Sequence, residues 1–447
     1  MQGTTARSSR WAWRTDTHSV SSFQLLTPTR RKEQCPIHST SQSPVPESAQ
    51  ALTPVDVLVV GAGPAGSAAA KMLAAAGHRV LMIDQAPLGR DKICGDALIP
   101  DAHHALRRLG VLDSVMAQAE GASHVACIGP SGGRIDVPGA LAVLPRQVLD
   151  EILARAAMAA GASFQQARFE APLLNSDGRV CGARLKFGDQ VVEQAARWVL
   201  LATGAVPKAL QAAGMCLRQT PSGVALRGYV HAPSMVGKIT ALEVAWSYAV
   251  RPGYGWIFPA PNGHFNIGAG VSDSYGGGKK SKDVNLRKLF DAFVAAYPPA
   301  AQLMREGKLV GELKGAPLRC TLAGATFTRP GLMVVGEAAG STYDFTGEGI
   351  GKAMQTAMLA ADAILAHPQS DADARTQYEA GLAALAPTYR LYERANRVNA
   401  FPWLTDLLIW RAKKSERLLR RMSGVLEETS NPGNLLSFKG IYRLFTE

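Results

Sequence analysis

Residues 55–66 constrain the fold of this chain more than any other stretch. A short apolar run, VDVLVV, ends in a turn that carries Gly61, Gly63 and Gly66, and an alanine-rich run at 67–76 follows. Glycine permits the tight turn, the close approach of a phosphate to the backbone, and close packing of the helix on the strand. The order predicts a strand, a turn and a helix whose N-terminus binds the pyrophosphate of a dinucleotide.

The sequence after this helix strengthens the prediction. A second apolar run at 79–83 ends on Asp84, which is where a βαβ unit presents a carboxylate to the ribose hydroxyls. Pro64 and Ala65 complete the turn. A G-x-G-x-x-G pattern alone is also found in ordinary glycine-rich turns. With strand, helix and acid in the expected order, dinucleotide binding is the better interpretation.

Composition and cysteine spacing exclude several other classes of protein. With 47% apolar and 19% charged residues, the chain is typical of a globular enzyme. Its net charge is +12, but no block of Lys and Arg is long enough for a nucleic-acid-binding arm, so we expect no nucleic-acid partner. Its 6 cysteines are widely spaced without a C-x-x-C pair, which argues against a zinc site or a disulfide framework and favours a reducing compartment. We expect a cytoplasmic location.

The order of predicted elements indicates an α/β fold. We expect a Rossmann-type dinucleotide-binding domain at 54–215 and 320–370, interrupted by a strand-rich substrate domain at 216–319 and followed by a helical region at 371–447. Helices are predicted at 101–120, 146–160, 286–296 and 347–365, and strands over 163–201 and 223–272.

Residues 1–53 differ in composition from the rest. They are rich in Ser, Thr, Gln and Arg and poor in acids, which predicts a disordered N-terminal extension. The same composition is found in organelle transit peptides, so targeting by this segment stays open.

Four further stretches give the chain a resemblance to the flavoprotein superfamily of aromatic hydroxylases and geranylgeranyl reductases. They are Arg146 at a helix start, Ala-Thr-Gly at 202–204, Gly-Glu-Ala-Ala-Gly at 336–340 and Phe-Thr-Gly-Glu-Gly-Ile-Gly at 345–351. The resemblance implies FAD as cofactor. It implies that Arg146 contacts the flavin and that the strand end at Gly204 lies beside the adenosine part of FAD. It also implies that the segment of Gly336 and Glu337 holds the ribityl chain, although the family has Asp where this chain has Glu337.

The same resemblance places Gly347, Gly349 and Ile350 at a helix start under the isoalloxazine ring. A helix N-terminus there would stabilise the negative charge of a reduced flavin.

Two more motifs resemble the geranylgeranyl reductase family in particular. The segment Arg-Asp-Lys-Ile-Cys-Gly-Asp at 90–96 is similar to that family's K-x-C-G-x segment, which implies that Arg90, Cys94 and Gly95 lie beside the flavin. The segment Tyr-Gly-Trp-Ile-Phe-Pro at 254–259, followed by Gly-Ala-Gly, is similar to its Y-x-W-x-F-P…G-x-G signature.

The aromatic residues of the second motif also carry an argument of their own. On a strand Tyr254, Trp256 and Phe258 would share one face, because side chains alternate. Such an aromatic wall suits a long apolar substrate, although an ordinary strand core has the same pattern.

The resemblance implies an FAD-dependent reductase that saturates C=C bonds of an isoprenoid chain, whether geranylgeranyl, phospholipid or quinone side chain. An isolated alkene needs a proton donor, a dry pocket and aromatic faces that tolerate positive charge. We therefore take Cys94, Asp96, Tyr254 and Trp256 as the catalytic candidates and favour Cys94, or a water near it, as the proton donor. Tyr343 and Glu348 are further candidates.

Other functions and partners stay open at this point. The chain could be a flavin monooxygenase or halogenase of the same superfamily, or a non-catalytic flavin-binding or electron-shuttling protein. No second G-x-G-x-x-G unit is present for a nicotinamide nucleotide, so electrons would come from transient NADPH binding or a reduced ferredoxin-like donor. Residues 401–422 mix apolar and basic side chains, which predicts either peripheral contact with an anionic membrane or packing on the core.

Overall fold

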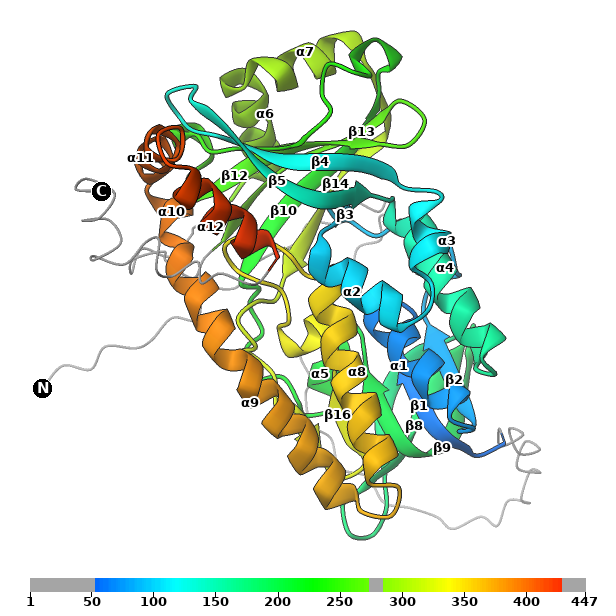
Figure 1. Ribbon diagram of the computed structural model, residues 1–447. Coiled ribbons are helices and arrows are strands. Elements are labelled where there is room, and N and C mark those ends of the chain that lie inside the picture. The colour runs from blue at the N-terminus through cyan, green and yellow to red at the C-terminus, as the bar shows by residue number, and fades with distance from the viewer. Residues whose placement is uncertain (1–52, 273–283, 428–447) are drawn as a thin grey trace, which may run out of the picture. The chain divides into compact units, whose positions relative to one another are not determined.

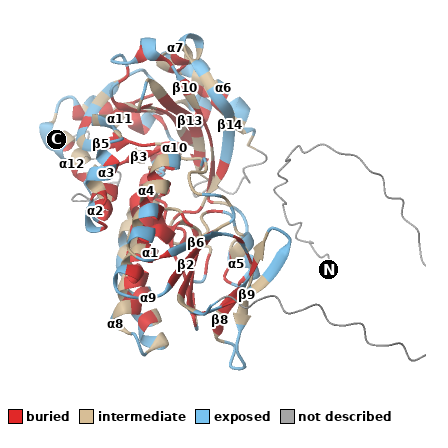
Figure 2. Cartoon of the chain, turned by 90° about the vertical axis from the view of Figure 1, so that its right-hand side faces the viewer, coloured by how far each residue is buried: buried red, intermediate tan, exposed pale blue. Residues whose placement is uncertain are grey.

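The computed structural model describes residues 53–272 and 284–427, which form two β-sheets and the helices that cover them (Figure 1). The predicted extension at 1–53 lies outside the described residues, apart from its last residue. Buried residues are concentrated in the two sheets and in the helices packed against them (Figure 2).

The first sheet is built around the predicted dinucleotide motif. Its strands lie in the order β15-β16-β9-β1-β2-β6, and β7 and β8 extend it from β9 as an antiparallel hairpin. The central strands β16, β9, β1, β2 and β6 are parallel. The strands span β1 Val55–Val60, β2 Val80–Asp84, β6 Ser163–Gln166, β7 Arg168–Leu174, β8 Val180–Phe187, β9 Gln190–Leu201, β15 Thr328–Arg329 and β16 Leu332–Val334. Because β1 is buried on both faces, its sequence is a nearly continuous apolar run.

Helices from four parts of the chain build one core on this sheet. Helices α1 and α4 pack together, α1 packs on α8, and both α2 and α9 contact α8 (Figure 1). The helices of this core are α1 Pro64–Ala75, α2 Pro100–Arg108, α3 Leu112–Met116, α4 Arg146–Ala159, α8 Ile350–Ala366 and α9 Asp371–Ala395, whereas α5 Lys208–Ala212 packs in the core on the opposite face of the sheet. The helix predicted at 101–120 is two helices, because Gly110 adopts a φ of +67° and ends the first of them.

The second sheet is larger than the predicted substrate domain. Its order is β14-β10-β13-β12-β11-β4-β5-β3, antiparallel except for the parallel pair β4 and β11. The strands are β3 Ala97–Leu98, β4 Glu120–Ile128, β5 Arg134–Val143, β10 Gly223–His231, β11 Leu242–Ala245, β12 Gly253–Ala260, β13 His264–Ser272 and β14 Lys308–Leu318. The strands β3 to β5 come from the range 54–215 predicted for the dinucleotide-binding domain, but they pair within the second sheet.

The two faces of the second sheet are covered by different helices. Helices α6 Leu286–Ala296 and α7 Pro298–Glu306 lie over one face, where Phe290 and Phe293 enter the core. On the other side, α11 contacts β4 and α12 contacts β5 (Figure 1). The bounds of these C-terminal helices are α10 Arg397–Ala400, α11 Trp403–Ala412 and α12 Glu416–Leu426. No helix within the described residues is long and apolar enough to cross a membrane.

Candidate active site

A cavity of about 790 Å³ has walls from both sheets. It begins at the turn after β1, passes the loop at 90–96, and reaches the C-terminal helices, where Asn399, Thr405 and Leu408 line it. All the site residues predicted from the sequence line this cavity except Gly66 and Gly336. These two have packing roles, since an added Cβ would lie 1.8 Å from the carbonyl oxygen of Gly61 and 2.6 Å from the Cβ of Ala65, respectively.

The turn after β1 has the features that a dinucleotide needs. Gly61 adopts a φ of +108°, and an added Cβ would lie 2.3 Å from the carbonyl oxygen of Ala202. Gly63 is different, because the nearest atom to an added Cβ is Nη2 of Arg146 at 3.7 Å. Gly61 is therefore required by the fold, whereas Gly63 leaves space at the cavity wall.

Asp84 stands at the end of β2 as predicted. Its two carboxylate oxygens accept backbone N–H bonds from Ala62 and Ala86, each at 3.0 Å, and Nη2 of Arg90 lies 3.6 Å away. These contacts fix the carboxylate beside the glycine turn, where it can accept hydrogen bonds from ribose hydroxyls.

Arg146 forms a buried ion pair with Asp150 beneath the same turn. The guanidinium donates from Nε and Nη2 to the two carboxylate oxygens at 2.6 and 2.8 Å, and both side chains are less than a tenth exposed. Because the two residues are one turn apart on α4, the helix itself presents the pair to the cavity.

The polar groups of the cavity fit the FAD that the sequence implies. Helix α1 begins at Pro64 and α8 at Ile350, and the N-cap residues, Gly63 and Gly349, have no side chain that could cap the helix. Each helix N-terminus therefore offers free N–H groups to an anionic or carbonyl oxygen. The hydroxyls of Thr203 and Thr346 are buried at the cavity without a hydrogen-bond partner in the part of the chain that the structure describes. Such groups call for a polar ligand.

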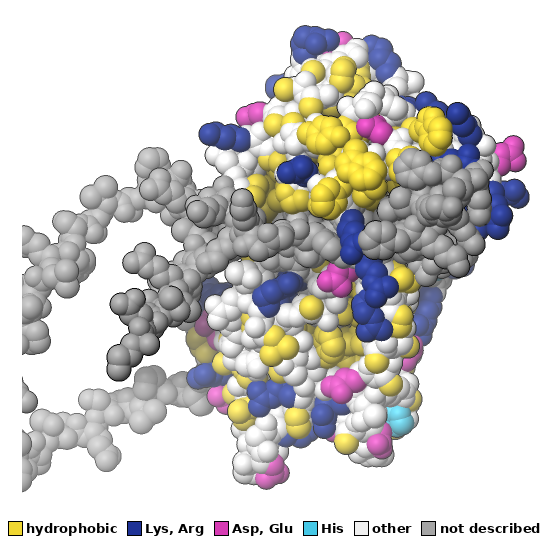
Figure 3. Space-filling model, turned by 90° about the vertical axis from the view of Figure 1, so that its left-hand side faces the viewer, with side chains coloured by type: hydrophobic (Ala, Val, Ile, Leu, Met, Phe, Trp, Pro, Cys, Tyr) yellow, Lys and Arg dark blue, Asp and Glu magenta, His cyan; other side chains and the backbone are white. Residues whose placement is uncertain are grey.

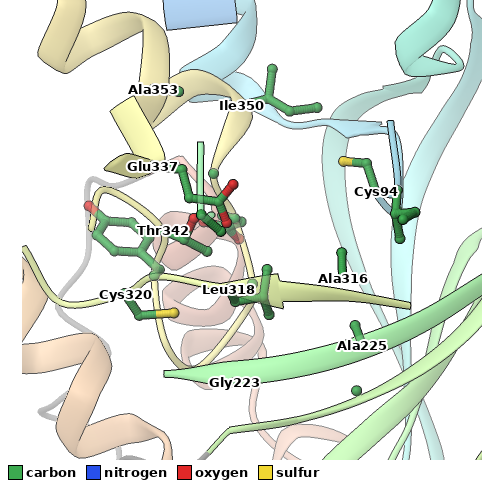
Figure 4. A pocket seen from close by; sticks show the side chains of 18 of the residues that line it. Cys94, Gly223, Ala225, Ala316, Leu318, Cys320, Glu337, Thr342, Ile350 and Ala353 are labelled. Atoms are coloured by element: carbon green, nitrogen blue, oxygen red, sulfur yellow. The ribbon is translucent and has the colours of Figure 1, made fainter. Parts of the chain in front are cut away.

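Glu337 and Cys94 approach the cavity from opposite sides (Figure 4). The carboxylate of Glu337, where the superfamily has Asp, points into the space and lies 3.9 Å from Nζ of Lys92. Small residues, Ala225 and Ala316 among them, line the cavity between the two side chains and leave it open.

The loop that carries Cys94 is fastened to the second sheet by charged residues. Asp91 pairs with Arg227 of β10 at 2.6 Å and with Lys314 of β14 at 3.0 Å, and Arg227 also donates to the carbonyl of Lys92 at 3.0 Å. Arg227 is only 2% exposed, and its guanidinium lies 4.2 Å from the centre of the Tyr229 ring.

Asp96, at the end of this loop, is a fully buried carboxyl group with unusual surroundings. Its φ is +66°, and its Oδ2 accepts hydrogen bonds from the phenol of Tyr229 and, at 2.7 Å, from the amide of Asn266. Its Oδ1 has no partner among the described residues. Burial raises the pKa of Asp96 to about 6, against the lowering effects of Tyr229 and Arg227. Burial also raises the pKa of the Cys94 thiol, which keeps that group neutral.

The aromatic wall has the predicted geometry. The ring centres of Tyr254 and Trp256 lie 6.3 Å apart, and those of Trp256 and Phe258 lie 6.4 Å apart. On the opposite face of the same strand an added Cβ at Gly255 would meet the Phe293 ring at 2.1 Å. Strand alternation therefore directs the three aromatic side chains to the cavity and the glycine to α6.

Sequence reasoning missed the residues that hold this site together. Arg227, Tyr229, Asn266 and Lys314 contact the loop at 90–96 but belong to strands far away in the chain. The signal was a polar or charged side chain within a mostly apolar strand. Among the described residues the cysteines are free, and no cluster of metal-ligating side chains is present.

Comparisons with known proteins agree with this geometry. Residues 54–263 match the model of an FAD binding domain. A menaquinone reductase from Mycolicibacterium smegmatis is 34% identical over 326 residues, covering 69% of this chain and 76% of the relative. A digeranylgeranylglycerophospholipid reductase from Methanopyrus kandleri is 30% identical over 301 residues, covering 66% and 73%.

Solved structures show the same fold at lower identity. A geranylgeranyl bacteriochlorophyll reductase-like protein from Thermoplasma acidophilum aligns with a TM-score of 0.66 and 23% identity over 88% of this chain and 96% of its own. A flavin-dependent brominase aligns with a TM-score of 0.63 and 20% identity over 88% and 98%.

Fold, cavity and relatives together define an FAD-dependent oxidoreductase. The chain belongs to the geranylgeranyl reductase family, which confirms the resemblance drawn from the segments at 90–96 and 254–259.

Proposed function

We propose that the protein saturates carbon–carbon double bonds of an isoprenoid chain that lies in the cavity along Tyr254, Trp256 and Phe258. The observation that carries this proposal is the continuity of the cavity, in which the dinucleotide turn and the aromatic wall line one space of about 790 Å³. The relatives named for quinone and prenyl-lipid reduction support the same class of substrate. When bound, reduced FAD supplies a hydride to the alkene.

The chain's own residues would bind FAD at the first sheet. Gly63 and the N-terminus of α1 would bind the pyrophosphate. Asp84 would accept hydrogen bonds from the ribose, and Glu337 would accept them from the ribityl hydroxyls. Arg146, held by Asp150, and the N-terminus of α8 lie on the cavity side where they can contact the flavin ring. These roles agree with the position of each residue on the cavity wall.

The proton for the second carbon is assigned to Asp96 rather than to Cys94. A pKa of about 6 makes Asp96 the stronger acid near neutral pH, whereas burial raises the pKa of Cys94 above its ordinary value. The Oδ1 atom of Asp96, without a partner among the described residues, is free to carry the proton. Cys94 accepts a bond from the Asp96 backbone N–H at 3.3 Å and so orients the loop.

Aromatic faces contribute in a second way. Protonation of a trisubstituted alkene creates cationic character at the more substituted carbon, and the faces of Tyr254 and Trp256 stabilise such charge in a dry cavity. Trp256, in the middle of the wall, is only 7% exposed, so little water reaches its ring.

The test is an anaerobic incubation of dithionite-reduced holoprotein with menaquinone and prenyl diphosphates, read by mass spectrometry. We expect a gain of two hydrogens for each bond reduced, and a loss of turnover in Asp96→Asn at normal flavin content. No gain with any substrate, together with oxygen consumption coupled to NADPH oxidation in air, would instead indicate a monooxygenase. Full turnover in Asp96→Asn would remove the assignment of the proton.

We also infer that the C-terminal helices contact an anionic lipid surface. Phe401, Trp403 and Trp410 are about half exposed, at 50%, 47% and 49%. Trp403 and Trp410 lie two turns apart on α11 and so share a face. Hydrophobic side chains gather between Lys and Arg on the side of the molecule where α9 to α11 lie (Figure 3).

Other apolar residues of 401–422 do not belong to this surface. Leu404, Ile409 and Leu418 are buried in the core, as the packing alternative predicted. The test is sedimentation of the full chain with phosphatidylglycerol vesicles. The double variant Trp403→Ser with Trp410→Ser should lose binding, whereas Leu217→Ser, at an exposed position between α5 and β10, should not. Equal binding by all three proteins would remove the inference.

A further inference from the structure

Asn266 occupies the contact between the aromatic wall and the loop at 90–96. It lies on β13, and its side chain is 0% exposed. Its Oδ1 accepts the indole N–H of Trp256 at 2.9 Å. Its Nδ2 donates to the carbonyl oxygen of Cys94 at 2.8 Å and to Oδ2 of Asp96 at 2.7 Å.

These three bonds fix the orientation of the carboxamide. An indole N–H can only donate and a backbone carbonyl can only accept, so the two ends of the Asn266 amide are not interchangeable. The Trp256 ring is itself immobilised, because it lies against the backbone of Gly268, where an added Cβ would be 2.2 Å from the ring. One amide thus joins a fixed indole to a fixed loop.

We propose that Asn266 is a positioning residue that joins Trp256 and Asp96 into one hydrogen-bonded unit and thereby sets the pH at which Asp96 holds its proton. This goes beyond the proposed function and rests on it only for the catalytic consequence. The bond from Nδ2 stabilises the ionised carboxylate, since an N–H donor favours the charged form of an acid.

The other groups that face Asp96 make the effect of Asn266 separable. Tyr229 and Arg227 approach from β10, Arg146 from α4, and Cys94 from the same loop. Arg227 and Arg146 act by charge and Tyr229 by a hydrogen bond, and none of them contacts Trp256 through Asn266. Removal of the Asn266 amide therefore leaves these contributions in place and takes away one donor.

The experiment measures the titration of Asp96 directly in the flavin-free protein. Infrared spectroscopy across a pH series detects the protonated carboxyl, and the band that is absent from Asp96→Asn identifies this residue. In Asn266→Leu we expect the titration midpoint to rise by about one to two pH units, the equivalent of one hydrogen bond to a charged group. In Asn266→Asp we expect a larger rise, because two neighbouring carboxyls cannot both ionise easily.

Asn399 offers a matched control in the same cavity. It accepts the indole N–H of Trp246 at 2.7 Å and is 1% exposed, but its other bonds go to Phe345 and Asn396 rather than to Asp96. Asn399→Leu should leave the midpoint unchanged. An unchanged midpoint in Asn266→Leu, or an equal shift in Asn399→Leu, would overturn the proposal.

The kinetic consequence is separate from the titration. If the protein is a reductase, the alkaline limb of its pH–rate profile should move to higher pH in Asn266→Leu, by the same amount as the carboxyl midpoint. A merely structural asparagine would lower the rate equally at all pH values. Because the infrared midpoint needs neither substrate nor flavin, failure of the proposed function would not be mistaken for failure of this inference. If Asn266→Leu does not fold, Asn266→Ala, which also removes the amide donor without adding a second carboxyl, serves for the same measurement.

Discussion

The phenol of Tyr254 donates a hydrogen bond to the carbonyl oxygen of Thr346 at 2.5 Å. This bond joins the aromatic wall on β12 to the glycine-rich loop before α8. The same phenol lies 2.8 Å from where a Cβ would be at Gly347, whose φ of +71° also favours glycine, so glycine suits this close approach of the loop to the wall. The relationship sets the distance between the wall that would bind substrate and the helix start that would bind the flavin.

Tyr254→Phe should therefore loosen the site without unfolding the protein. Loss of one neutral hydrogen bond costs about 1 kcal/mol, and we expect the turnover of isoprenoid substrate to fall roughly fivefold. Flavin titration measures the loosening of the site, and steady-state kinetics measures the fall in turnover. Tyr248→Phe is the control, since that ring is 60% exposed. A turnover equal to wild type would show that the Tyr254 bond is dispensable.

The two glycines of the turn should behave differently. Gly61→Ala should destabilise the protein by roughly 1–3 kcal/mol, because its φ of +108° and a contact of 2.3 Å with backbone both oppose a side chain. Gly63→Ala should fold like wild type, since the nearest atom is 3.7 Å away, but bind FAD about tenfold or more weakly. Thermal unfolding measures the stability of each variant, and flavin fluorescence measures its FAD affinity. Wild-type stability in Gly61→Ala, or wild-type FAD affinity in Gly63→Ala, would contradict the prediction.

Arg146 should matter for folding and for cofactor in separable ways. Arg146→Ala leaves the buried Asp150 without its partner, which typically costs about 3–5 kcal/mol. The double variant Arg146→Ala with Asp150→Ala should regain much of that stability and still bind FAD weakly. Arg155, paired with Glu151 on the same helix but 71% exposed, is the matched control and should change neither property. Urea unfolding measures the stability and FAD titration the cofactor affinity of each variant. Equal values of both for Arg146→Ala and the control Arg155→Ala would contradict this account.

Asp96 should make stability depend on pH. Its folded pKa of about 6 lies above the ordinary 3.8, so the folded protein binds more protons than the unfolded chain in this window. The stability that protonation contributes is present below pH 4 and is lost as pH rises through 6, by roughly 3 kcal/mol. Asp96→Asn lacks this loss, so its free energy of unfolding relative to wild type should rise between pH 4 and pH 7. A constant difference across that range would show that the carboxyl is not held protonated.

Local pattern predicted much of the fold. The glycines and the acid of the first βαβ unit, the helix at 146–160 and the helix at 286–296 follow from periodicity and turn residues, and the structure has α4 at Arg146–Ala159 and α6 at Leu286–Ala296. These features depend on residues near one another in the chain. The break at Gly110 and the start of α8 at Ile350, beyond the predicted 347, depend on backbone conformation that composition alone does not fix.

Partners across the sheets could not be read from the sequence. The strands β4 and β5 pair as neighbours in the chain, but nothing local says that β4 also pairs with β11, from another part of the chain. For the same reason Asn266 looks like one polar residue in an apolar strand until β13 is placed beneath the loop at 90–96. Leu404 and Leu418 likewise belong to helices that look amphipathic in the sequence, and only the structure shows that both side chains are buried.

The central claim is that a reducible isoprenoid chain lies against the flavin in this cavity. Its most direct test is the anaerobic return of flavin absorbance when a polyprenyl substrate is added to the photoreduced holoprotein. We predict that the yellow absorbance returns under argon, with one equivalent of flavin oxidised for each double bond saturated. A flavin that stays bleached with every isoprenoid substrate and recovers only on admission of oxygen would contradict the account.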